Sequence, residues 1–235
     1  GVQAEPGAEP EPSRPATARA ASCAIVGDDA ALTGAVAGAL EARGVRCMAV
    51  PAAEVGAGFD AAAAALSSAA ERTGALDAVV VALTEGSPTG SVSAGSDRAS
   101  GWERILAEHD GLADAIRVDA GWVRAVADLA ARDGHRVRVV TVVDATSAGG
   151  RSRAQAASQL SRAARGATSG QVAAFVLALE APDPGGSATV GQIVAHLVCS
   201  EAAVELSGAE LVAGDGWLGL RSHPRPAGSI TFGGP

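Results

Sequence analysis

The sequence of 235 residues contains no tyrosine, one methionine, three cysteines and only 3% aromatic residues. Its hydrophobic content is nevertheless 48%, and most of it is alanine and valine. This composition supplies ample material for a core, which we expect to form by close approach of backbones rather than from large side chains. There is no apolar run of membrane-spanning length and no charged-then-apolar secretion signal. We therefore expect a soluble, cytoplasmic protein without a membrane partner.

Positive charge is also scarce. The chain has 18 basic and 26 acidic residues, a formal net charge of −8 and an isoelectric point near 5.0. This balance argues against a nucleic acid or an anionic membrane as partner. Cys23, Cys47 and Cys199 are far apart and show neither CxxC nor Cys/His spacing, so we expect no metal site. Cys23 and Cys47 fall in predicted buried strands, where cysteine acts as a small hydrophobic residue.

Strand and helix patterns alternate along the chain between two polar tails, residues 1–20 and 221–235. The predicted strands cover 22–26, 45–50, 76–83, 137–143, 171–179 and 209–213. The predicted helices cover 30–43, 60–72, 102–112, 121–133, 155–165 and 190–199. The segment 86–101 is rich in Ser and Gly and predicts a mobile loop. The order predicts one domain at 21–220, a Rossmann-like doubly wound parallel sheet in three α/β/α layers.

The stretch 139–164 is the centre of this arrangement. An apolar strand leads into a Gly/Ser loop, which is followed by a helix of small residues. In doubly wound folds a reaction is located at the carboxyl end of such a strand. However, the stretch contains no Tyr, Lys, His or Cys. The layout is that of an enzyme, but the side chains for acid/base chemistry are missing.

Several segments in order resemble the short-chain dehydrogenase/reductase family over essentially 21–221. The segment LVCSEAAVELSGAELVAGDGWLGLR (197–221) is the most specific, because its Asp215-Gly216-Trp217 matches the family's closing pattern. LDAVVVAL (76–83) is similar to the family's fourth strand, and WERILAEH (102–109) to the helix that normally carries a structural Asn. The resemblance implies a Rossmann-like fold and NAD(P)-dependent chemistry.

The family's phosphate loop, Thr-Gly-x3-Gly-x-Gly, is poorly matched here. The corresponding stretch is VGDDAALT (26–33), in which only Gly27 remains. Ala31 and Thr33 place side chains where backbone approaches phosphate in the family. Asp28 and Asp29 add negative charge, and we interpret them as an N-cap of the following helix. These vestigial positions predict that this chain binds no cofactor.

A second loss concerns the adenosine side of the site. Between the strands 45–50 and 76–83 there is room for one helix, whereas the family fits a helix, a strand and a further helix there. Pro51 lies near the place of the family's ribose-binding acidic residue. Glu54 could substitute as a ribose ligand, but an exposed loop residue is the simpler interpretation.

The resemblance also assigns the catalytic positions. The family's Ser corresponds to Asp144, or to Thr146 or Ser147 if the loop slips, and the Tyr-x-x-x-Lys pair to Gln155 and Gln159. Gln transfers no proton at any useful pH, so these positions are degenerate.

The structural Asn of the family becomes His109. Asp144 with His109, or Asp144 with His135, could form a different acid/base pair, although a lone His is more often structural.

We therefore predict a pseudoenzyme that associates with an active paralogue, which carries the NAD(P) and acts on an acyl thioester. This expectation comes from heteromeric members of the family. The predicted subunit interface consists of Trp102, Trp122, Ala154, Ala157, Ser161 and Trp217. The basic residues Arg151, Arg153, Arg162 and Arg165 could bind an acyl-CoA or acyl-carrier phosphate, face an acidic partner or be solvated. The alternatives are an NAD(P)-dependent oxidoreductase with displaced catalytic residues and a homo-oligomeric ligand-binding scaffold.

Overall fold

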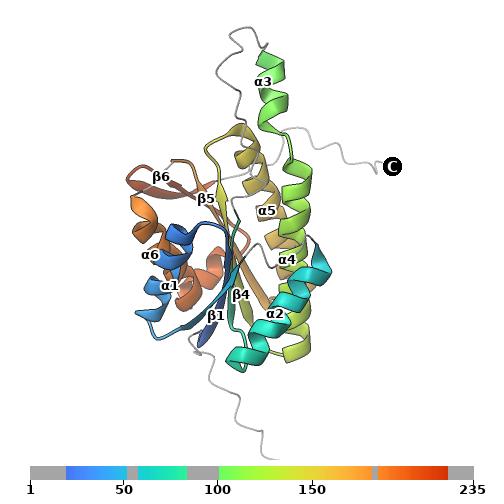
Figure 1. The fold of residues 1–235 in the computed structure, drawn as a ribbon, viewed down its shortest axis with the longest axis vertical. Coiled ribbons are helices and arrows are strands. Elements are labelled where there is room, and N and C mark those ends of the chain that lie inside the picture. Colours follow the sequence, from blue (N-terminus) through green and yellow to red (C-terminus); the bar gives the residue numbers. More distant parts are fainter. Residues whose placement is uncertain (1–19, 52–57, 84–100, 182–184, 222–235) are drawn as a thin grey trace, which may run out of the picture.

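The computed structural model describes residues 20–51, 58–83, 101–181 and 185–221. A seven-stranded sheet is covered on both faces by helices (Figure 1). The strands are β1 (Ser22–Gly27), β2 (Arg46–Pro51), β3 (Ala78–Ala82), β4 (Val137–Asp144), β5 (Val172–Leu179), β6 (Glu210–Gly214) and β7 (Trp217–Arg221). The helices are α1 (Ala30–Glu41), α2 (Phe59–Thr73), α3 (Gly101–Glu108), α4 (Leu112–Asp133), α5 (Ala148–Ala167) and α6 (Gly186–Cys199), and a short 3-10 helix covers Ala202–Leu206.

The strand order is β2-β1-β3-β4-β5-β6-β7, and all pairs are parallel except β6 with β7. This confirms the predicted doubly wound sheet in a single three-layer domain. From β1 the chain moves to β2 on one side and then returns to β3 on the other. The direction of winding thus reverses beside β1, and in open α/β sheets a crevice for ligands lies at the carboxyl ends of the strands at that point.

Two groups of helices cover the sheet. Helices α1 and α6 lie on one face, and α2, α4 and α5 lie on the other (Figure 1). Alternate residues of each strand point to opposite faces, so Ile25 and Val80 enter the core under α1 and α6, whereas Val26 and Val79 enter the core under α2 and α4. Alanine and valine supply most of both cores, as the composition predicts.

Helices α4, α5 and α6 begin earlier than predicted, and a glycine explains the error in α4 and in α5. The predicted helix 121–133 begins at Leu112, and Gly121 lies inside it, where an added Cβ would be 3.2 Å from the backbone of Gly58. The predicted helix 155–165 begins at Ala148, and an added Cβ at Gly150 would be 2.1 Å from the Asp144 carbonyl oxygen. These glycines allow close approach between elements, and neither of them ends a helix.

Strand β7 was not predicted. Residues Asp215 and Gly216 form a two-residue turn, because Gly214 pairs with Trp217 across the antiparallel hairpin, and Gly216 has a φ of +70°. Asp-Gly is the characteristic sequence of such a turn. The chain from Trp217 to Arg221 therefore returns along β6 as the edge of the sheet. In the described ranges, no helix is long and apolar enough to cross a membrane.

The three cysteines are free thiols. Cys23 is fully buried and Cys47, its register partner on β2, is half-buried. Burial raises the pKa of the Cys23 thiol well above its usual value and that of Cys47 to about 11. Both side chains therefore stay protonated at neutral pH, as expected of cysteines that contribute packing rather than chemistry.

The carboxyl end of α6 is attached to the sheet by a buried arginine. Arg138 on β4 is 4% exposed, and its guanidinium donates to the carbonyl oxygens of Leu197, Val198 and Ser200 and to the Glu201 carboxylate. The last carbonyls of a helix lack partners within the helix. Arg138 satisfies them and carries a charge that suits the negative end of the helix dipole.

Replacing this arginine tests its contribution to stability. We expect Arg138→Met to lower the free energy of unfolding by about 3 kcal/mol, because it leaves the buried carbonyl oxygens at the end of α6 without their donor and removes the nearer cation from Glu201. Arg136 is the matched control, since it is exposed and reaches the same Glu201 at 3.8 Å. Arg136→Met should cost less than about 0.5 kcal/mol in urea unfolding. Equal losses for the two variants would contradict the assigned role.

Candidate functional site

The crevice beside β1 is the candidate site. Strands β1, β3, β4 and β5 end there, and the part of the crevice lined by described residues has a volume of about 160 Å³. Its lining consists of Asp29, Leu32, Ala82, Val142, Asp144, Leu179 and Ala181.

The amino terminus of α1 points into this crevice and is capped by its own chain. The Asp29 carboxylate accepts hydrogen bonds from the backbone N–H groups of Ala31, at 2.8 Å, and Leu32, at 3.1 Å. The predicted N-cap is therefore confirmed for Asp29. Free N–H groups at a helix amino terminus form a natural anion site. Here a carboxylate of the protein occupies that site.

Gly27, at the end of β1, is covered by a side chain. A Cβ added to Gly27 would be 2.4 Å from Cγ2 of Thr33 and 3.0 Å from the Ala82 carbonyl oxygen. The Thr33 hydroxyl donates to the Asp29 carbonyl oxygen at 2.8 Å, which holds its methyl group toward Gly27. The space that glycine leaves beside the strand end is therefore filled by Thr33 rather than open to a ligand.

The end of β4 forms a local turn. Asp144 is exposed, and its Oδ1 accepts hydrogen bonds from the backbone N–H and the hydroxyl of Thr146, at 2.9 and 2.7 Å. The Ser147 hydroxyl accepts from the Gly150 N–H and caps α5. The structure therefore gives each of these three polar residues a role in beginning the next helix.

Each of the two histidines contacts groups other than Asp144. The His109 ring contacts the Ile105 carbonyl oxygen through Nδ1, at 2.7 Å, and the Ser152 hydroxyl through Nε2, at 3.2 Å, and so joins the end of α3 to α5. His135 precedes β4 and contacts the Leu76 carbonyl oxygen. The length of β4 separates it from Asp144 by about 23 Å. The structure therefore excludes the Asp144–His135 pair and gives His109 structural contacts.

The residues of α5 that point into the protein are not the predicted catalytic pair. Gln155 and Gln159 are exposed on its outer face. Arg153, in contrast, is 1% exposed and lies on the same face as Ala157 and Ser161. This arginine is the main polar residue that the sequence analysis placed wrongly, because it was assigned to a basic surface. Arg153, Ala157 and Ser161 are four residues apart and so lie on one helix face, and this spacing could have indicated that Arg153 points inward.

The buried arginine joins three elements near the crevice. Its Nε and Nη2 donate to the two carboxylate oxygens of Asp119 on α4, both at 2.8 Å, and Nη1 donates to the carbonyl oxygen of Leu83, just after β3, at 3.0 Å. Asp119 is also 1% exposed. The arrangement is a bidentate ion pair. It fixes α4, α5 and the end of β3 relative to one another.

Known structures share this fold. A short-chain dehydrogenase from Mycobacterium avium matches with a TM-score of 0.64 and 17% identity, over 92% of this chain and 89% of that one. An acetoin dehydrogenase from Salmonella typhimurium matches with a TM-score of 0.56 and 18% identity, over 83% and 96% of the two chains. A short-chain dehydrogenase/reductase from Mycobacterium marinum gives 0.59 and 14%, over 83% and 94%.

The fold is that of the short-chain dehydrogenase/reductases. In sequence, no family model and no curated protein matches the chain.

The short-chain dehydrogenase/reductase fold implies NAD(P) as its cofactor, so the residues of this chain can be tested against that group. They do not fit it. The N–H groups that would hold a pyrophosphate donate to Asp29, and Thr33 fills the space over Gly27. The full sequence also contains neither tyrosine nor lysine, so this fold's usual proton donor and its basic partner are absent. We derive no hydride-transfer step for this chain.

Four of the six predicted interface residues are interior. Trp122, Ala154, Ala157 and Ser161 are between 0% and 3% exposed and pack inside the chain's own fold. Helix α5 packs this small-residue face onto its own sheet, which explains the error. Trp102 and Trp217 are exposed by 66% and 51%. They are the members of the predicted set that lie on the surface.

The four arginines after β4 do not form one basic patch. Arg153 points inward, whereas Arg151 donates to the Thr146 carbonyl oxygen at the start of α5. Arg162 and Arg165 donate to the carbonyl oxygens of Gly208 and Ser207. They follow Arg151 by three to four helical turns, about 16–21 Å along the axis. A thioester carrier would therefore not meet all four together.

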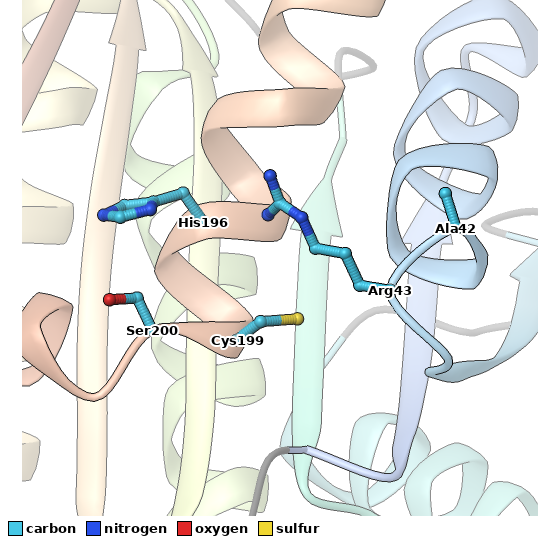
Figure 2. A pocket seen from close by; sticks show the side chains of 5 residues that line it. All are labelled: Ala42, Arg43, His196, Cys199 and Ser200. Atoms are coloured by element: carbon cyan, nitrogen blue, oxygen red, sulfur yellow. The ribbon is translucent and has the colours of Figure 1, made fainter.

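A larger hollow, of about 490 Å³, lies at the opposite end of the sheet. It is lined by Ala42, Arg43, His196, Cys199 and Ser200, between the ends of α1 and α6 (Figure 2). Figure 2 shows Arg43, in the turn after α1, and Cys199, at the end of α6, on opposite sides of the hollow. Arg43 donates to Gln192 at 3.1 Å. This hollow is far from the strand carboxyl ends, so its size does not make it the candidate site.

Some predictions fall outside the described residues. Glu54, the possible ribose ligand, and all of the predicted loop 86–101 except Gly101 lie there. Over the described ranges, no group of three His, Cys, Asp or Glu side chains is arranged to hold a metal ion.

The buried ion pair allows a direct stability test. Asp119→Asn and Arg153→Met should each cost about 3–5 kcal/mol, because each leaves a buried charge without the carboxylate or guanidinium that faces it in the ion pair. The double variant Asp119→Leu/Arg153→Met should recover most of that loss, since no unpaired charge remains.

The matched control is the exposed pair of Asp114 and Arg117 on the same helix α4. Arg117→Met should cost less than about 0.5 kcal/mol. Urea unfolding measures all four variants. A double variant as unstable as the sum of the two single losses would show that the pair is not coupled.

Proposed function

We propose that this chain is a catalytically inactive subunit with the short-chain dehydrogenase/reductase fold. It associates with an active paralogue in a heteromeric dehydrogenase or ketoreductase, in which the paralogue carries the NAD(P). The observation that carries the proposal is the Asp29 carboxylate, which occupies the amino terminus of α1 through the N–H groups of Ala31 and Leu32.

The electrostatics of the α1 terminus support the loss of cofactor binding. A pyrophosphate at this position would replace the Asp29 carboxylate on its two N–H donors, and the displaced charge would remain nearby. Two unit charges 4 Å apart repel each other by about 1 kcal/mol even in water, and more strongly inside a crevice. Thr33 would also have to leave its contact with Gly27. Pyrophosphate binding would therefore require two native contacts to break, the Asp29 cap of α1 and the packing of Thr33 on Gly27.

The chemistry of the crevice supports the loss of catalysis. A positioned general acid accelerates a reaction by roughly 10²–10⁴. Asp144 and His109, the candidates for displaced chemistry, are engaged with Thr146, Ile105 and Ser152. Arg153, which reaches the end of β3, is engaged with Asp119 and the Leu83 carbonyl oxygen. These contacts favour the inactive subunit over an enzyme with displaced residues.

The surface supports association through helix α3. Trp102, Ile105 and Leu106 have helical spacing and are 66%, 47% and 55% exposed. Figure 1 shows α3 extending beyond the rest of the domain. An exposed apolar helix face of this kind suits a protein partner. The identity of the partner as an active paralogue and the thioester substrate rest on the family resemblance alone.

Nucleotide binding tests the proposal. We expect no binding of NADH or NADPH to the purified chain up to about 1 mM, measured by calorimetry and by nucleotide fluorescence. The variant Asp29→Gly/Thr33→Gly should gain measurable affinity, because it frees two N–H donors and opens the space beside Gly27. Glycine is tolerated at a helix N-cap at a cost of a few tenths of a kcal/mol.

Asp60→Gly is the control, since it removes the same charge from the first turn of α2. It should bind no nucleotide. Micromolar binding by the unmodified chain would refute the cofactor part of the proposal.

A further inference from the structure

Another hollow, of about 680 Å³, lies where α5 ends and where strands β5 and β6 begin. It is therefore at the end of the sheet opposite the crevice. Arg162 and Arg165 line it from the last turns of α5, and their spacing of three residues places them on one face of that helix. Gly166, Gly170 and Gly208 line the same hollow and add no side chain to it. The two guanidiniums are the charged groups of its described lining.

The protein fixes both guanidiniums on one short segment of backbone. Arg162 donates to the Gly208 carbonyl oxygen at 3.3 Å, and Arg165 donates to the Ser207 carbonyl oxygen at 3.0 Å. The segment is itself attached to β5, because the Ser207 hydroxyl accepts from the Ala174 N–H at 3.0 Å and the Gly208 N–H donates to the Ala174 carbonyl oxygen at 2.8 Å. Consecutive Cα atoms are about 3.8 Å apart, so the two positive charges are held side by side.

Gly208 also positions the stem of Arg162. Its φ is +85°, and a Cβ added to it would be 2.8 Å from Cγ of Arg162. Glycine adopts this left-handed conformation without strain and leaves room for the arginine stem. The Arg162 side chain therefore lies against a fixed surface, and it loses little further freedom when a ligand binds.

The described residues provide no carboxylate to balance the two arginines. Over the described ranges, each guanidinium forms one hydrogen bond, to a main-chain carbonyl oxygen, and neither forms an ion pair. In contrast, Arg117 and Arg132 on α4 each pair with an aspartate. Two positive charges held side by side repel each other, and an anion bound by both would offset that repulsion. The arrangement is unusual in a chain whose net charge is −8.

We propose that Arg162 and Arg165 form a binding site for a phosphate dianion, either free or as the monoester group of a small molecule. A phosphate monoester carries a charge of about −2 at neutral pH and several acceptor oxygens. This matches two guanidiniums, whose forked N–H groups bind phosphate oxygens in pairs. A carboxylate supplies a single charge and fewer oxygens. The hollow leaves room beside the arginines for the rest of a small molecule.

The inference goes beyond the proposed function and can fail separately from it. The hollow lies at the amino end of β5, whereas the crevice lies at the carboxyl end of the same strand. Strand β5 has eight residues and spans about 26 Å. A ligand at one site therefore does not contact the other.

An amide NMR titration of the full chain with inorganic phosphate and with glycerol phosphate, at about pH 7.5 and low salt, tests the proposal. We expect the signals of Gly170 and Gly208 to shift and to saturate with a Kd of about 1–5 mM. The signal of Gly27, at the crevice, should not move. Tighter binding of glycerol phosphate would identify an organic monoester as the ligand, and tighter binding of inorganic phosphate would identify the free ion.

The variant Arg162→Gln/Arg165→Gln should raise the Kd at least tenfold, because it removes both charges and both forked donors. Arg165→Gln alone should raise it about threefold. The matched control is Arg117→Gln/Arg132→Gln, which removes the same charge from arginines that have aspartate partners. Its Kd should stay within about twofold of that of the unmodified chain. The amide spectra show whether each variant is folded.

Three outcomes overturn the proposal. The first is the absence of any saturable shift up to about 20 mM of either probe. The second is an equal loss of binding in the two double variants, which would assign the effect to net charge. The third is a saturable shift confined to residues outside the hollow.

Discussion

The buried ion pair between Arg153 and Asp119 is the interaction on which the crevice end of this molecule depends. Both side chains are 1% exposed, and a charge buried to that degree is tolerated only with a well-placed partner. The bidentate geometry satisfies the carboxylate, and Nη1 of Arg153 donates to the Leu83 carbonyl oxygen, just after β3. A shift of α4 or α5 would separate the two charges and leave each of them buried without its partner.

The consequence for function follows from where the ion pair lies. Near the strand ends, where ligands bind in open α/β sheets, the polar side chains of this chain bind other groups of the same chain. Asp29 caps α1, Asp144 and Ser147 shape the start of α5, and His109 ties α3 to it. Each group satisfies a backbone or side-chain partner within the chain. These contacts hold the helix ends at the crevice in place.

The alternation of strand and helix could be predicted because buried parallel strands appear as apolar runs. The true starts of α4 and α5 could not be predicted, because glycine occurs both in loops and inside helices where two elements approach closely. Gly121 and Gly150 resemble loop residues in sequence, but the structure needs them where elements nearly touch. Such contacts depend on segments distant in sequence. The Asp215-Gly216 turn, in contrast, was a local signal for β7 that could have been found.

The loss of the family's catalytic and cofactor-binding residues could be predicted from the sequence. The contacts that the residues at those positions make instead were harder to predict. The absence of tyrosine and the altered loop at 26–33 are plain in the sequence. The N-cap by Asp29 follows from local rules. The inward direction of Arg153 does not follow from local rules. The helical spacing shows that Ala157 and Ser161 share a face with it, but not that this face packs on the chain's own sheet rather than on a partner.

Native mass spectrometry of the untagged protein, purified from its own host, tests the central claim most directly. The account predicts a hetero-oligomer that contains a second chain of the same fold, with Tyr and Lys in its own catalytic motif, and nucleotide only on that chain. A homo-oligomer that carries one NAD(P) per chain would contradict it.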